Sequence, residues 1–158
     1  MEKYAAIFLL SGAVLFGSGG TLCKPGEKTI FSCDTGGKKL SVCRKSSKVS
    51  YRYGKPHHTE LEISSRPYYS SRQFSRASTE SHLRFHNRGY DYVIYSKEIY
   101  EYKNHPNDGT GRYNTYDGLY VVKNGRVITK KSCRRIYPHA LGIERVGRYA
   151  KKEPFEEY

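Results

Sequence analysis

Several common signatures are missing from this 158-residue sequence. It has no Gly-x-Ser-x-Gly motif, which disfavours a serine hydrolase built on a nucleophile elbow. It shows no repeat with a period of about 20 to 50 residues, which disfavours a solenoid or a propeller. Its main apolar run, residues 5–16, is shorter than the about 20 residues that a transmembrane helix needs. The features that remain concern export, disulfides and charge.

The first residues have the order of a secretory signal peptide. Lys3 precedes the uncharged apolar run at residues 5–16, and the small residues 17–20 follow it. A basic start, a short apolar segment and small residues before the cleavage site are typical of such signals. A lipid anchor is disfavoured, because no Leu-x-Gly-Cys-like tetrapeptide precedes Cys23. We expect residues 1–19 to be a cleaved signal peptide and the mature protein to be periplasmic or secreted.

The chain is strongly basic. It carries 28 Lys and Arg against 15 Asp and Glu, a formal net charge of +13. Residues 1–19 hold one acid and one base, so the whole excess belongs to the mature part. Such a charge attracts anionic partners, and the attraction weakens as the salt concentration rises. The expected partners are an anionic glycan or an acidic protein of the cell envelope, and nucleic acid is a third class that this charge allows.

Four cysteines follow the expected cleavage site: Cys23, Cys33, Cys43 and Cys133. An even number in an exported chain predicts two disulfides. The first three are each nine residues apart, whereas zinc sites use pairs about two to four residues apart, so we expect no metal site and no cofactor. Four cysteines allow three pairings. A turn at residues 34–37 places Cys33 and Cys43 at opposite ends of a hairpin, which favours pairing Cys23 with Cys43 and Cys33 with Cys133.

Short β-rich runs alternate with turns through most of the mature chain. Strands are predicted at residues 28–33, 39–43, 49–54, 59–63, 83–86, 90–95, 118–123 and 126–129. The clearest signal is Asn124-Gly125 between the last two runs, because this pair favours a tight hairpin turn. Residues 64–81 are rich in serine and are expected to be a loop or a poorly ordered strand edge. Residues 104–115 contain proline and glycine and are expected to be a loop.

These runs predict a mainly β fold, either a small antiparallel sandwich or a partly open barrel, tied by disulfides. Residues 138–149 fit one short C-terminal helix, with Pro138 in its first turn. A single β domain is expected over residues 20–150. The polar residues 151–158 are expected to form a mobile tail.

The six histidines offer an enzymatic alternative. In a basic cleft, His82 or His86 could act on a phosphate ester, as in a secreted phosphodiesterase or ribonuclease. Glu60 or Glu62 would then be the base, and Arg84 would hold the phosphate. On a strand His82 and His86 would lie about 13 Å apart, which disfavours metal chelation by the pair. Solvated surface side chains explain the same residues.

Sixteen tyrosines, with no tryptophan and one methionine, are the most unusual feature of the composition. Several stand beside arginines. Interleaved Arg and Tyr side chains can stack on sugars or bases and bind phosphate or carboxylate groups. The alternative is a set of cross-strand tyrosine pairs with solvated arginines. The candidate binding residues are Tyr51, Arg52, Tyr53, Arg84, Arg112 and Tyr113.

Residues 23–43, 51–56 and 84–95 resemble a group of small exported proteins of Gram-negative bacteria that have no assigned activity. The resemblance implies a periplasmic location and a β fold, and it carries no catalytic residue. In size and cysteine-tied β plan the chain is also similar to periplasmic inhibitors of C-type lysozymes, which use a Ser-Gly-x-x-Tyr loop. The nearest segment, residues 110–113, reads Thr-Gly-Arg-Tyr and lacks the serine. The charge of +13 also opposes binding to a basic lysozyme.

Together these patterns predict a non-enzymatic periplasmic protein that binds an anionic envelope component or an acidic protein. An inhibitor or immunity-type protein is one form of this class. The competing expectation is the secreted phosphodiesterase.

Overall fold

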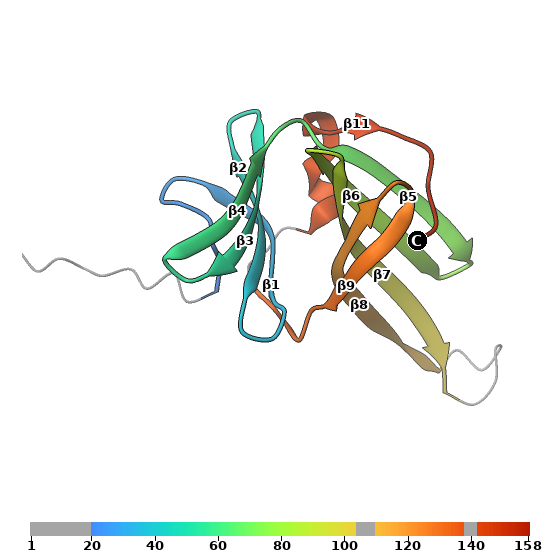
Figure 1. Cartoon of the computed structure of the whole chain (residues 1–158). Coiled ribbons are helices and arrows are strands. Elements are labelled where there is room, and N and C mark those ends of the chain that lie inside the picture. Colours follow the sequence, from blue (N-terminus) through green and yellow to red (C-terminus); the bar gives the residue numbers. More distant parts are fainter. Residues whose placement is uncertain (1–19, 104–109, 138–141) are drawn as a thin grey trace, which may run out of the picture.

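The computed structural model describes residues 20–103, 110–137 and 142–158, and the predicted signal peptide lies outside these residues. The described chain forms two β-sheets with a short helix between them at one end (Figure 1). Sheet 1 has the strand order β10-β1-β2-β3-β4, and sheet 2 has the order β11-β5-β6-β7-β8-β9. All neighbouring strands are antiparallel except β11, which pairs with β5 in parallel.

The strands of sheet 1 are β1 (Lys28–Asp34), β2 (Lys39–Lys45), β3 (Lys48–Lys55), β4 (His58–Ser64) and β10 (Arg135–Ile136). The strands of sheet 2 are β5 (Tyr68–Ser75), β6 (Ser78–Asn87), β7 (Tyr90–Tyr102), β8 (Gly111–Lys123), β9 (Arg126–Ser132) and β11 (Lys151–Lys152). The helix η1 is a 3-10 helix at Ile143–Tyr149.

One hydrophobic core joins the facing surfaces of the two sheets, which we call their inner faces. The rings of Tyr51 on sheet 1 and Phe85 on sheet 2 lie 5.8 Å apart in this core. Ile143 and Val146 of η1 are fully buried against the same cluster. The predicted mainly β fold with two disulfides is therefore confirmed. Of the two predicted architectures it is the sandwich, because the sheets do not close into a barrel.

The hairpin predicted at Asn124-Gly125 is present, and both residues have the positive φ angles, 49° and 71°, that its tight turn requires. Of the two alternatives predicted for residues 64–81, the loop is wrong, because this segment forms β5, next to the short edge strand β11, and the start of β6. The predicted loop at residues 104–115 is wrong from Gly111 onward, where β8 begins. In both places backbone pairing with a neighbouring strand outweighs a composition that favours loops.

The predicted C-terminal helix is present as η1. Residues 138–141 of the predicted range lie outside the described residues. Gly147 interrupts the helix with a φ angle of 49°, which a residue with a side chain seldom adopts. The helix ends at Tyr149, and the chain then crosses directly to β11 at the edge of sheet 2.

The last residues pack against sheet 2, in contrast to the mobile tail that the sequence predicted. Lys151 and Glu153 donate backbone hydrogen bonds to the carbonyls of Pro67 and Tyr69. Residues 153–158 then lie on the outer face of sheet 2, where the ring of Phe155 stacks on His82 at 4.4 Å. Glu153 pairs with an arginine of that face, as described below.

Both favoured disulfides are formed. Cys23–Cys43 closes a loop within the N-terminal part of sheet 1, and Cys33–Cys133 ties β1 to the segment that leaves β9. Two disulfides indicate an oxidising compartment outside the cytoplasm. Among the described residues, no helix has the length and apolar character needed to span a bilayer.

Candidate functional site

Two of the predicted binding tyrosines belong to the core. Tyr51 is 1% exposed and packs against the rings of Phe85 and Tyr92. Tyr53, two residues along β3 and on the same inner face, is partly buried against the same cluster. Their position follows from the alternation of side chains along β3, which also turns Arg52 to the opposite face.

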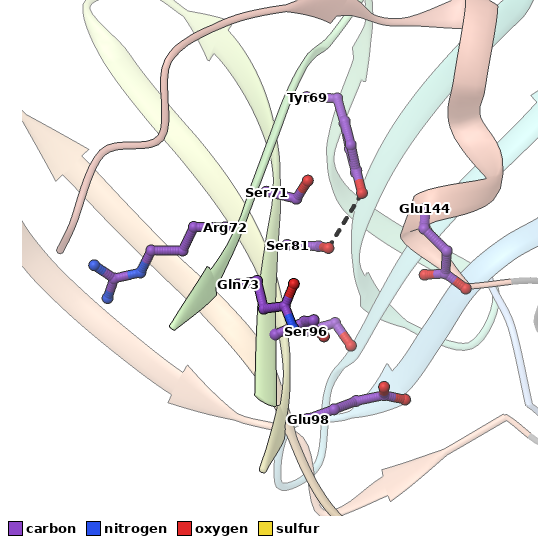
Figure 2. A pocket seen from close by; sticks show the side chains of 9 residues that line it. Tyr69, Ser71, Arg72, Gln73, Ser81, Ser96, Glu98 and Glu144 are labelled. Atoms are coloured by element: carbon purple, nitrogen blue, oxygen red, sulfur yellow. Dashed lines mark hydrogen bonds between the residues drawn. The ribbon is translucent and has the colours of Figure 1, made fainter. Parts of the chain in front are cut away.

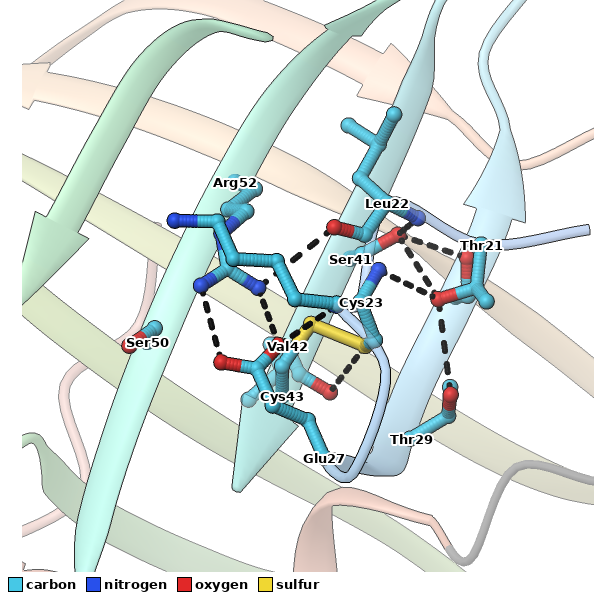
Figure 3. Close-up of a disulfide and its surroundings, with 12 residues drawn as sticks. Thr21, Leu22, Cys23, Glu27, Thr29, Ser41, Val42, Cys43, Ser50 and Arg52 are labelled. Carbon is cyan, nitrogen blue, oxygen red and sulfur yellow. Dashed lines mark hydrogen bonds and ion pairs between the residues drawn. A yellow bond between two sulfur atoms is a disulfide. The ribbon is translucent and has the colours of Figure 1, made fainter. Parts of the chain in front are cut away.

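Arg52 is buried on the outer face of sheet 1, beneath the N-terminal segment (residues 20–27), and is 2% exposed (Figure 3). Its guanidinium donates to both carboxylate oxygens of Glu27 and, at 2.9 Å, to Oε1 of Glu62. These bonds raise the pKa of Arg52. Burial raises the pKa of Glu27, but the bonds from Arg52 and from the backbone of Lys24 outweigh it and keep that pKa below its ordinary value. Arg52 therefore fastens the N-terminal segment and has no free donor fork for an outside anion.

Arg84 plays the same part on the outer face of sheet 2. It donates to the carboxylate of Glu153 in the C-terminal segment (residues 151–158) and, at 2.9 Å, to Asp91 of β7. Its guanidinium also lies 4.5 Å from the centre of the Tyr68 ring. The bonds from Glu153 raise the pKa of Arg84. This arginine is thus committed to holding the C-terminal segment in place.

Arg112 and Tyr113 lie at the beginning of β8, far along the sheet from Arg84. Both are exposed, Tyr113 by 60%, and Tyr113 contacts the ring of Tyr100 on β7 at 5.0 Å. Here β7 and β8 extend beyond the ends of β6 and β9 as a two-stranded arm. The six predicted binding residues are therefore spread over two sheets and both faces, and the structure does not bring them into one site.

The residues of the enzymatic alternative are also separated. His82 is 2% exposed beneath Phe155, its Nε2 lies 3.1 Å from Oε1 of Glu80, and burial lowers its pKa. His86 is exposed and contacts Asp91 at 2.9 Å. The two glutamates considered as bases lie on sheet 1, where Glu60 pairs with Lys38. Within the described part of the chain, these residues therefore lie on two different sheets.

Within the described residues, one group has the geometry to hold a metal: Cys23, Glu27 and Cys43. The two cysteines are bonded to each other, so their sulfurs are not available as thiolate ligands. The group is therefore a disulfide beside an ion pair (Figure 3).

A pocket that the sequence analysis missed lies where β9 ends, mostly on the outer face of sheet 2, and Thr115 and Asp117 of the inner face also line it. Its volume is about 460 Å³, within the range of small-ligand sites. Three tyrosines and three bases characterise its lining, and we call it the Tyr–Lys pocket. These residues are Tyr95, Tyr116, Tyr120, Lys97, Lys130 and Arg134.

Strand register explains why these side chains meet. Lys97 of β7 lies opposite Tyr116 of β8, and Tyr120 of β8 lies opposite Lys130 of β9. Between the two tyrosines of β8 stands Gly118, where a Cβ atom would come within 2.5 Å of the Tyr95 hydroxyl. The missing side chain leaves room for the Tyr95 ring.

The centre of the pocket is an aromatic pair with a cation beside it. The rings of Tyr95 and Tyr120 are stacked, with their centroids 4.5 Å apart. Lys130 Nζ lies 5.6 Å from the first centroid and 5.3 Å from the second. Such cation–π contacts hold the ammonium group over the rings without neutralising its charge. The pocket therefore presents an apolar platform and a free positive charge together.

The three bases of the pocket differ in their acidic neighbours. Among the described residues, Lys130 has no carboxylate within ion-pair distance, whereas Lys97 lies 3.5 Å from Glu80 and Arg134 is close enough to Asp34 to interact with it electrostatically. The lining contains one acid, Asp117, which accepts a hydrogen bond from Ser96. Burial raises the pKa of Asp117, which weakens its tendency to carry charge. The pocket thus favours anions.

The C-terminal segment reaches the edge of this pocket. The ring of Tyr158 lies 5.8 Å from the ring of Tyr120, which lines the pocket. Beside it, Glu157 pairs with Arg72 at 3.1 Å, and Glu153 pairs with Arg84. On the outer face of sheet 2, the acidic and aromatic C-terminal segment thus packs on arginines and aromatic rings. The bases and rings of the Tyr–Lys pocket lie next to it on the same face.

No family model, curated protein or solved structure matches this chain. The resemblance to small exported proteins of Gram-negative bacteria therefore stays a prediction. What the chain binds has to be inferred from its own geometry.

Proposed function

We propose that this protein is an exported, non-enzymatic binding protein that holds an anionic glycan in the Tyr–Lys pocket. One observation carries the proposal: the stacked rings of Tyr95 and Tyr120 lie beside Lys130, which has no carboxylate within ion-pair distance among the described residues. A finer proposal places the protein in the periplasm. The signal-like pattern of residues 1–19 and the two disulfides support it.

An anionic sugar matches both components of the pocket. The apolar face of a sugar ring can pack on a tyrosine ring, while lysine and arginine bind its carboxylate, sulfate or phosphate. The pocket, with a volume of about 460 Å³, has the size of a site for a small ligand such as one or two sugar rings. A protein partner would instead contact a surface area of roughly 800 Å². Nucleic acid fits the same chemistry, but an oxidising compartment outside the cytoplasm favours the envelope glycan.

The proposal contains no catalytic step. Among the described residues, the pocket lining holds no histidine, and its one carboxylate, Asp117, is buried and hydrogen bonded. The phosphodiesterase alternative gains no support from this geometry, because its histidines lie outside the pocket.

Equilibrium binding of a galacturonic acid tetramer, measured by calorimetry at low salt, tests the proposal. Lys130→Ala is expected to weaken binding about tenfold, because it removes one charge-assisted contact. Tyr116→Ala, at an exposed position, is expected to weaken it by a similar factor through lost stacking. Raising the salt concentration should weaken binding further.

Lys48→Ala is the matched control, since Lys48 is exposed on sheet 1 and its loss changes the net charge equally. The methyl ester of the same tetramer, which has no charge, should bind at least about tenfold more weakly. Equal losses in Lys130→Ala and Lys48→Ala would show general attraction to a basic surface and would refute a glycan pocket. A tetraglutamate peptide or a short RNA that binds more tightly than the glycan would also refute it.

A further inference from the structure

The inner face of sheet 2 carries a second pocket, separate from the Tyr–Lys pocket and of opposite character. Its volume is about 410 Å³. Its floor lies beyond the part of sheet 2 that the core covers, and Glu144 of η1 stands over it (Figure 2). Figure 2 also shows that Arg72, at its margin, points away from the other side chains of the lining.

Strand register arranges this inner face in rows that run across β5, β6, β7 and β8. The first row is the apolar core row of Tyr69, Leu83, Ile94 and Leu119. The second row is Ser71, Ser81, Ser96 and Asp117, and the third is Gln73, Thr79, Glu98 and Thr115. Every side chain in the second and third rows can form hydrogen bonds, and none is aliphatic. We call these two rows the polar floor.

The polar floor offers both donors and acceptors. Ser81 of the floor shares a hydrogen bond of 3.1 Å with the hydroxyl group of Tyr69 in the neighbouring core row. Ser96 of the floor donates to Asp117. The hydroxyl groups of Ser71 and Thr79 stand at exposed positions on the same floor. Serine and threonine hydroxyls donate and accept, whereas carboxylates only accept. A ligand with several hydroxyl groups can satisfy such a mixed set.

Charge separates this pocket from the anionic ligand proposed above. Glu98 and Glu144 line it, and among the described residues neither has a basic partner within ion-pair distance. Besides burial, the negative charges of Glu98 and Glu144 raise the pKa of Asp117, so all three carboxyl groups are close enough to interact. An anionic ligand would be repelled here.

We propose that the polar floor is a second binding site, which takes a neutral saccharide unit. The cavity has the volume of a site for one or two sugar rings. Sugar hydroxyls donate to Glu98 and Glu144 and accept from Thr79 and Ser71. At the outer end of the floor, the ring pair Tyr100 and Tyr113 on the arm provides an apolar surface for a following sugar ring. The site does not depend on the proposed function of the Tyr–Lys pocket.

Titration with maltotetraose and with chitotetraose, two neutral tetrasaccharides, tests this site through backbone amide chemical shifts and calorimetry. Saturable binding of at least one is expected, with the largest shifts at Ser71, Ser81, Ser96 and Glu98. Glu98→Ala should weaken the binding about tenfold and Thr79→Val about fivefold, because each removes one hydrogen-bonding group from the floor. Both positions are exposed, so the variants should keep the fold, and thermal melting checks this.

Glu101→Ala is the matched control, because Glu101 is an exposed glutamate on the same strand but on its other face. It should leave the affinity unchanged. No saturable binding of either tetrasaccharide by the folded protein would overturn the proposal, and so would an equal loss in Glu101→Ala. Binding that persists in Glu98→Ala but is lost in Lys130→Ala would place the sugar in the Tyr–Lys pocket. That result would overturn the second site and leave the first standing.

Discussion

The two terminal segments are held to the molecule by the same device, with one difference. Residues 20–27 lie on the outer face of sheet 1 over Arg52, and residues 153–158, which follow the edge strand β11, lie on the outer face of sheet 2 over Arg84. Each segment contributes a glutamate to its arginine, Glu27 or Glu153. The N-terminal segment is also bonded covalently through Cys23–Cys43, whereas the C-terminal segment is held without a covalent tie, by backbone hydrogen bonds to β5, ion pairs and ring contacts.

The comparison teaches how to interpret the excess of bases. Where the chain supplies its own carboxylate, as at Arg52 and Arg84, the base is part of the structure. Where the described chain places no carboxylate within ion-pair distance, as at Lys130, the charge of the base is not engaged in an internal ion pair. The C-terminal segment, with three glutamates and two aromatic rings in residues 153–158, shows how an acidic and aromatic part of this chain packs on the bases and rings of sheet 2.

The largest effect on stability is expected from replacing Arg52, the arginine that holds the disulfide-bonded N-terminal segment. Arg52→Met should lower the free energy of unfolding by about 3 to 5 kcal/mol, because Glu27 loses its partner in a buried environment. The same change at Arg84 should lower it by about 2 kcal/mol, because that ion pair is more exposed. Urea unfolding measures both. Lys45→Met, at an exposed position on sheet 1, is the control and should change the value by under about 0.5 kcal/mol.

If both arginine variants have equal stability, the two segments are not held as described. A loss of less than about 1 kcal/mol in the free energy of unfolding of Arg52→Met would also show that the buried Arg52–Glu27 ion pair contributes little to stability.

Removal of the covalent tie should make the two segments alike. The double variant Cys23→Ala with Cys43→Ala opens a loop with a sequence separation of 20 residues, which should cost about 3 kcal/mol. Hydrogen exchange at the amide of Leu22, which donates to Ser41 Oγ, should then become as fast as at Lys151. Exchange at Leu22 that stays slow in the double variant would mean that Arg52 alone secures the segment.

The two segments should respond to acid at different pH values. Burial holds the pKa of His82 below its ordinary value of 6.5, so its neutral form stabilises the fold above that pH and this contribution is lost as the pH falls. The groups around it are Glu80, Arg72, Glu153, Phe155 and the tyrosines Tyr120 and Tyr158. The C-terminal segment should therefore loosen as the pH drops below about 6.5.

The N-terminal segment should stay closed further into acid. The pKa of Glu27 lies below its ordinary value of 4.5, so its contribution is present above that pH and is lost only below it. Hydrogen exchange at Glu153 and Leu22, followed from pH 7 to pH 4, measures the difference. His82→Asn should remove the dependence at Glu153 near pH 6, and equal pH dependence at both amides would contradict the comparison.

Parts of this fold that depend on adjacent residues could be predicted from the sequence. Asn124-Gly125 specifies its turn by its own backbone preferences, and the cysteine spacing limits the disulfides that a hairpin permits. Strand β5 was predicted only as one of two alternatives, because its inner-face residues Ser71 and Gln73 belong to the polar floor and the usual apolar alternation is absent. The packing of the C-terminal segment was missed because Arg84 and Glu153 are 69 residues apart.

The Tyr–Lys pocket left a weak signal in the sequence. Tyr95 and Lys97 on one strand, and Tyr116, Gly118 and Tyr120 on the next, are spaced two apart, so each set shares a face. Their meeting with Lys130 depends on register and on where β9 ends, which no local pattern gives. Arginines beside tyrosines were the more visible pattern, but burial and internal carboxylates occupy Arg52 and Arg84.

Amide and side-chain shift mapping of the uniformly labelled protein with the galacturonic acid tetramer tests the central claim most directly. The account predicts saturable shifts centred on Tyr95, Tyr116, Tyr120 and Lys130, with little change at exposed lysines of sheet 1. Shifts spread evenly over the basic surface, or centred on another site, would contradict it.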